Sequence, residues 1–150
     1  MKNKTIQYVH AIALLLFASF AFASTQHSTP AVGGYDLVTY QTAKRPARGT
    51  GHFVSEHEGV TYLFANSVNK AKFDKNPQRY LPAYGGYCAF GVSVGKKFAA
   101  DPEVWRVVDG RLYLNLDANI QDDWLKDVPA RIAKADANWP RIRDQHPSSL

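Results

Sequence analysis

The hydrophobic and polar positions along the chain predict two β-hairpins. Residues 52–65 alternate between apolar and polar side chains, with Glu58-Gly59 at the point where the chain would reverse. Residues 104–116 carry a second pair of β-rich segments around Asp109-Gly110. Asp-Gly between such segments is a strong hairpin signal, because both residues tolerate the left-handed backbone of a tight turn.

Short helices are predicted around these hairpins. Asp36 can cap a helical turn over residues 37–40, and Asn66 or Ser67 can cap a helix that ends near Lys75. A further turn is expected over 78–81, and two C-terminal helices over 119–126 and 129–138. The pattern shows no internal repeat and no second domain. We therefore expect one small α+β domain with antiparallel hairpins and with its C-terminal helices packed on the sheet.

The N-terminal residues have the pattern of a cleavable secretory signal. Lys2 and Lys4 precede an apolar segment that ends at Ala21-Phe22-Ala23. The segment has the length of a signal core, about 7–15 residues, and is shorter than the ~20 residues of a membrane-spanning helix. We expect cleavage between Ala23 and Ser24 and export to the periplasm or the medium, with no membrane attachment afterwards. The alternative is an uncleaved anchor.

This leader sets the expected organisation of the chain. We predict a signal peptide over 1–23, a flexible lead-in over 24–33, the domain over 34–140 and a tail over 141–150. The chain has a formal net charge of +5, but its lysines and arginines are scattered along the sequence. A nucleic-acid-binding domain would group them on one face, so we expect no nucleic-acid partner.

Cys88 is the only cysteine, so no disulfide can form within the chain. In an exported protein an unpaired cysteine indicates a free thiol or a bond to another molecule. It lies in an unusual segment of glycines and aromatic residues, residues 84–91. Cys88 is therefore a candidate redox or metal-binding residue. The alternative is a buried and inert cysteine, which is common in protein cores.

Two histidines are candidate partners of that thiol. His52 and His57 are an odd number of residues apart on one predicted strand, so they point to opposite faces and cannot easily share a metal ion. Either one could join Cys88, and thiolate with imidazole suits copper(I) or zinc. The alternative is that both are surface residues of the hairpin.

A small organic ligand is the other candidate for binding. Asp36, Tyr40, Tyr84 and Tyr87 could line a small pocket. The alternative is that the tyrosines belong to the core and that their hydroxyl groups are hydrogen-bonded. The sequence contains no serine-protease-like triad, nucleophile elbow or phosphate-binding loop. We therefore lean towards a protein that is not an enzyme.

Several motifs in combination resemble the exported YHS-domain proteins. They are Gly34-Tyr35-Asp36-Leu37-Val38-Thr39-Tyr40, Tyr62-Leu63-Phe64, the segment 73–80, Tyr84-Gly85-Gly86-Tyr87-Cys88-Ala89, the segment 109–115 and the segment 134–139. YHS domains are usually regarded as metal-binding and are similar to cysteine-rich, treble-clef-like modules. Some members of this family carry selenocysteine at the position that matches Cys88. The resemblance thus implies a redox or soft-metal role for that position.

The chain departs from the metal-binding modules at one place. Where they have paired cysteines, it has Ala65, Asn66 and Ser67, so a multi-cysteine zinc site is absent. The leading hypothesis is an exported module that binds a soft metal such as copper, or undergoes thiol chemistry, at Cys88. One alternative is a thiol oxidoreductase that uses an external resolving thiol. The other is a non-catalytic module that binds a small ligand or a protein and has a buried, structural Cys88.

Overall fold

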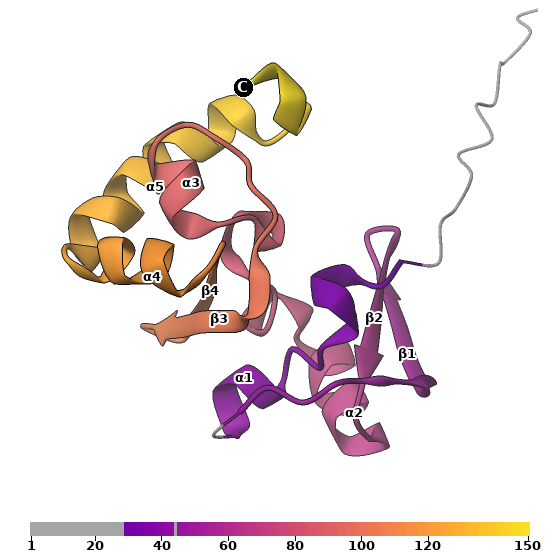
Figure 1. The fold of residues 1–150 in the computed structure, drawn as a ribbon. Coiled ribbons are helices and arrows are strands. Elements are labelled where there is room, and N and C mark those ends of the chain that lie inside the picture. The colour runs from indigo at the N-terminus through magenta and orange to yellow at the C-terminus, as the bar shows by residue number, and fades with distance from the viewer. Residues whose placement is uncertain (1–28, 44) are drawn as a thin grey trace, which may run out of the picture.

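The computed structural model describes residues 29–43 and 45–150 (Figure 1). The signal peptide and its cleavage site lie outside these ranges and stay predictions. The helices are α1 (Thr39–Thr42), α2 (Ser67–Lys75), α3 (Ala89–Ser93), α4 (Ala118–Leu125) and α5 (Val128–Ile142). Four 3-10 turns are η1 (Ala31–Gly34), η2 (Pro77–Arg79), η3 (Ala83–Gly86) and η4 (Pro147–Ser149). Within the described ranges, no helix is long and apolar enough to cross a membrane.

The two predicted hairpins are confirmed, and each forms its own antiparallel sheet. The first pairs β1 (Thr50–His57) with β2 (Val60–Phe64), and the second pairs β3 (Asp101–Val108) with β4 (Arg111–Asn115). Both turns form at the predicted acid-glycine dipeptides. Glu58 and Asp109 adopt the left-handed conformation there, with φ of 51° and 50°. The α+β class is confirmed, and the C-terminal helices contact the second hairpin.

The predicted helices form with shifted bounds, and α3 was not predicted. The predicted cap at Asp36 is wrong, because α1 starts at Thr39 after Val38 and has no side-chain cap. Asn66 caps α2, and its side chain accepts a hydrogen bond from the backbone N–H of Asn69 at 2.9 Å. Helix α5 runs past the predicted end to Ile142, which is buried. After the helix, Lys97 Nζ donates to the carbonyls of Arg143 and Gln145 at 2.9 and 2.6 Å. A lysine at this position satisfies carbonyl groups that a helix end leaves unpaired.

The structure corrects one expectation, because the chain does contain an internal repeat. Residues 31–75 form a 3-10 turn, a short helix, a hairpin and a helix, and residues 83–125 form the same elements in the same order. We call these segments the first and second repeats. In Figure 1 they are the indigo-to-magenta half and the pink-to-orange half of the molecule. Even the register shifts recur, between Thr50 and Val54 in the first repeat and between Asp101 and Trp105 in the second.

The turns that open the repeats share an unusual backbone. Val32 and Tyr84 both lie in the left-handed region, with φ of 50° and 56°, and two glycines with positive φ follow each of them. Such a conformation is costly for a residue with a side chain, above all for a β-branched one. Its occurrence at the same place in both repeats shows that the surrounding packing imposes it twice.

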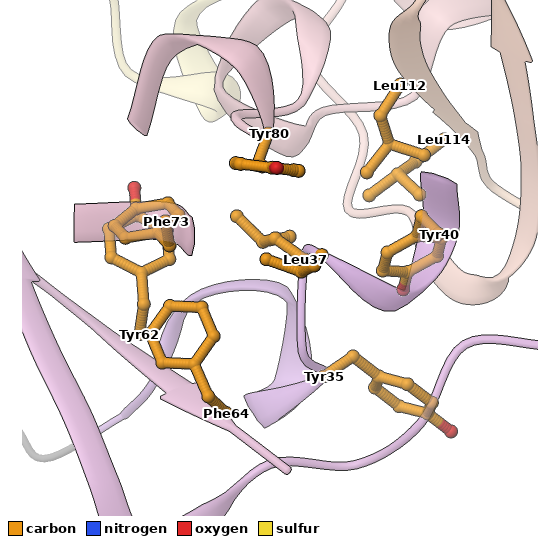
Figure 2. Close-up of a cluster of buried hydrophobic side chains, with 10 residues drawn as sticks. Tyr35, Leu37, Tyr40, Tyr62, Phe64, Phe73, Tyr80, Leu112 and Leu114 are labelled. Atoms are coloured by element: carbon orange, nitrogen blue, oxygen red, sulfur yellow. The ribbon is translucent and has the colours of Figure 1, made fainter. Parts of the chain in front are cut away.

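Strand β4 separates two hydrophobic cores. Leu112 and Leu114 pack into the first core beside Tyr40, as Figure 2 shows. Tyr113, between them, points to the other face and packs into the second core. The second hairpin thus covers the first repeat, and α5 covers the second repeat by packing on α3. Stacked repeats need such a terminal element, because each one leaves an apolar face for its neighbour.

Candidate functional site

Cys88 lies at the start of α3 and is fully buried, with 0% of its surface exposed. Its Sγ accepts a hydrogen bond from the backbone N–H of Gly91 at 3.4 Å and so caps the helix. The thiol in turn donates to Asn115 Oδ1 at the end of β4, over 3.8 Å. The sulfur therefore ties the first turn of α3 to the hairpin of its own repeat.

Asp36 occupies the equivalent position in the first repeat. The backbone N–H of Asp36 donates to Ala47 at 2.8 Å, and that of Cys88 donates to Phe98 at 3.0 Å, the matching place in the following loop. Asp36 is also fully buried. Its carboxylate accepts hydrogen bonds from Val38 N–H at 2.9 Å, Ala65 N–H at 2.9 Å and Asn69 Nδ2 at 2.7 Å. A buried carboxylate in the first repeat and a buried thiol in the second thus each accept a backbone hydrogen bond just before or within the short helix that follows.

The candidate histidines lie in the first repeat, whereas Cys88 lies in the second. His52 is exposed on β1, and His57 is half-buried on the opposite face. The ring of His57 meets Phe73 edge-on at 6.2 Å, and its Nε2 lies 3.8 Å from Glu58 Oε1. Across the part of the chain that the structure describes, no three His, Cys, Asp or Glu side chains are grouped so that they could hold a metal ion.

The four candidate ligand residues are divided between the repeats. Tyr40 lies with Asp36 in the first, and its hydroxyl donates to the carbonyl of Pro102 at 2.8 Å. Tyr84 and Tyr87 lie in the second repeat. The Tyr84 hydroxyl donates to Asp136 Oδ1 at 2.9 Å. Burial is the main cause that raises the pKa of both Tyr40 and Tyr84 well above 10. These two hydroxyl groups are neutral and already paired within the protein.

Tyr87 differs from the other three because it is only half-buried. Lys97 Nζ lies over its ring, 4.7 Å from the centroid, and 6.0 Å from the ring of Trp139. The same ammonium group binds the end of α5, so Tyr87 belongs to the packing of that helix against the second repeat. This role is structural.

Sequence reasoning missed a cavity at the junction of the two repeats. It measures about 260 Å³ and is bounded by η1, the first hairpin and the segment that leads into η3. Its walls include Val32, Val60, Tyr62, Leu81, Pro82 and Glu58. These residues are distant in sequence and carry no shared motif. The only available signal was the recurrence of Gly-Gly-Tyr at residues 33–35 and 85–87, which marks the repeat that creates the junction.

Comparison of the chain with protein-family models, curated proteins and solved structures gave no match. The likeness to exported YHS-domain proteins thus stays a prediction from the sequence motifs.

Proposed function

We propose that this protein is a non-catalytic binding module and that its single thiol is structural. The observation that carries this proposal is the setting of Cys88. Its sulfur is enclosed, and it accepts a backbone hydrogen bond at the position of the repeat where the buried carboxylate of Asp36 accepts one in the first repeat. A position at which either a thiol or a carboxylate accepts a backbone hydrogen bond does not depend on sulfur chemistry.

The setting argues against the thiol-redox and soft-metal hypotheses. Thiol exchange requires that a thiolate reach its target, and a buried sulfur without access is inert. Here the sulfur is fully buried and lies between the backbone N–H of Gly91 and Asn115 Oδ1. Metal binding at Cys88 would need at least one more ligand, and both candidate histidines belong to the other repeat. Either chemistry would require the second repeat to open.

Binding of a small ligand is supported by the junction cavity. Ligand sites are typically concave, mostly apolar, and placed where two structural units meet. The cavity meets these conditions, because aliphatic side chains form most of its wall and both repeats contribute to it.

Thiol labelling tests the proposal directly. The purified protein is treated with a chromogenic disulfide reagent in its native state and in denaturant. As a control, Val68→Cys adds a second thiol at a position that is 61% exposed. We expect the added thiol to react at once and Cys88 to react at least about a thousandfold more slowly, since exposure requires unfolding. If Cys88 reacts as fast as the added thiol in the native protein, the proposal is wrong.

Metal titration tests the soft-metal alternative separately. Copper(I) and zinc are titrated into the wild type and into Cys88→Ser, which keeps a group that can cap α3. We expect equal stoichiometry and affinity for both proteins. Loss of one tight site in Cys88→Ser would make Cys88 a metal ligand and would overturn the structural assignment.

A further inference from the structure

We propose that the junction cavity binds a small organic cation, namely a guanidinium or ammonium group on a short apolar stem. This inference rests on the proposed function as a binding module and names the site and the class of ligand.

The lining of the cavity fits such a ligand. Aliphatic side chains, among them Val32 and Leu81, would surround the stem. Tyr62 is the aromatic residue of the lining, and Glu58 is the one charged residue among the lining residues. A cation is attracted both to the face of a tyrosine ring and to a nearby carboxylate.

In the second repeat, the space that corresponds to this cavity is filled. Its occupant is the guanidinium group of Arg111, the first residue of β4. The central guanidinium carbon lies 5.1 Å from the ring centroid of Tyr84 and 5.6 Å from that of Tyr113. Its Nη1 lies 3.4 Å from Asp136 Oδ1. A cation of the second repeat thus sits against two tyrosines of that repeat and a carboxylate of α5.

The first repeat keeps part of this arrangement and lacks the cation. Tyr62 is the equivalent of Tyr113, because each is the third residue of the second strand in its hairpin. The equivalent of Arg111 is Val60, and the equivalent of Tyr84 is Val32. Both replacements are smaller and uncharged, which leaves the space open. A bound cation would take the place in the first repeat that Arg111 takes in the second.

The volume sets the size of the ligand. An engineered cavity of about 150 Å³ admits benzene. The junction cavity, at about 260 Å³, therefore has room for a guanidinium group with a stem of a few carbon atoms.

The test compares n-propylguanidinium with n-propylurea, which has nearly the same shape and no charge. Binding to the purified protein is followed by NMR chemical shifts at about pH 8, where an imidazole is ordinarily neutral. We expect the guanidinium compound to bind and the urea to bind at least about threefold more weakly, as loss of a cation–π contact and a charge pair implies. Equal binding of the two compounds, or no binding of the cation at millimolar concentration, would overturn the proposal.

Three variants locate the site. Glu58→Gln should weaken binding of the cation by about three- to tenfold, and Glu56→Gln, the matched change on the exposed face of the same hairpin, should leave it unaltered. Val60→Arg introduces a guanidinium group at the position equivalent to Arg111. It should abolish binding and leave the protein folded, as circular dichroism would show. Unchanged affinity in Glu58→Gln, or in a folded Val60→Arg, contradicts the inference.

The outcome is separable from that of the proposed function. If the cation fails to bind while Cys88 remains protected from labelling, the ligand class is wrong and the structural role of the thiol stands. If Cys88 reacts freely in the native protein, the proposed function fails whatever the cavity binds.

Discussion

Replacement of Asp36 by alanine should destabilise the protein more than any surface substitution. The buried carboxylate accepts three hydrogen bonds, from Val38 N–H, Ala65 N–H and Asn69 Nδ2. Each buried donor left without a partner costs about 1–3 kcal/mol, and the alanine variant leaves three of them. We expect a loss of about 3–9 kcal/mol, a large share of the ~5–15 kcal/mol that stabilises a typical domain.

Urea unfolding followed by tryptophan fluorescence measures this loss. Asp36→Asn should lose less, about 2 kcal/mol, because its amide keeps one acceptor oxygen but turns an N–H group toward a donor. Asp122→Ala removes an exposed carboxylate from α4 and should change the stability by no more than about 0.5 kcal/mol. If Asp36→Ala lies within about 1 kcal/mol of the wild type, the three hydrogen bonds do not hold the first repeat together as we argue.

Three further predictions follow from the packing. Gly49→Ala should cost at least about 3 kcal/mol or prevent folding, because a Cβ there would lie 2.3 Å from the carbonyl carbon of Leu63. Gly51→Ala is the matched control, since a Cβ at Gly51 meets nothing within 4 Å; an equal loss of stability in the two variants would show that the close approach to Leu63 is not the cause. Lys97→Met should lower the free energy of unfolding in urea by about 1–3 kcal/mol, because the carbonyls of Arg143 and Gln145 lose their donor. A stability unchanged from the wild type would show that water replaces the ammonium group without cost. The pKa of Tyr40 and of Tyr84 is raised in the folded protein, so these hydroxyl groups ionise at a lower pH in the unfolded chain. The stability that they contribute below about pH 10 should therefore fall as the pH rises above 10. A spectrophotometric titration should then show these tyrosines ionising only with unfolding, and reversible ionisation of all tyrosines near pH 10 in the folded protein would contradict their burial.

The hairpins and caps could be predicted because their signals are local. Gly59, Asp109 and Gly110 are residue types that tolerate the left-handed turn conformation, and both turns form where expected. Asn66 caps α2 for the same reason, since its side chain reaches an N–H group only three residues away.

The repeat could not be predicted from the hydrophobic pattern, because its two copies are similar in backbone conformation but not in amino-acid sequence. Asp36 and Cys88 differ in charge, size and chemistry, yet both are buried and accept a backbone hydrogen bond at the equivalent position. Val60 and Arg111 differ as strongly at the start of equivalent strands. The copies share the left-handed turn and the hairpin register. The glycines are the only residues whose type indicates this shared backbone.

The burial of the candidate site could not be predicted from the sequence for a related reason. Burial of Cys88 depends on Asn115 and on the cover that α5 gives to α3, which are tertiary contacts without a local signal. The glycines and aromatic residues around the thiol suggested close approach of a ligand. In the structure they form a turn and the packing surface for α5.

The structural role of Cys88 can be measured as the labelling rate of its thiol at several urea concentrations below the unfolding transition. If the sulfur is exposed only when the second repeat unfolds, the free energy of exposure should fall linearly with urea and should agree with the global free energy of unfolding. A fast rate that does not depend on urea would mean that the native protein presents its thiol to solvent, and would contradict the account.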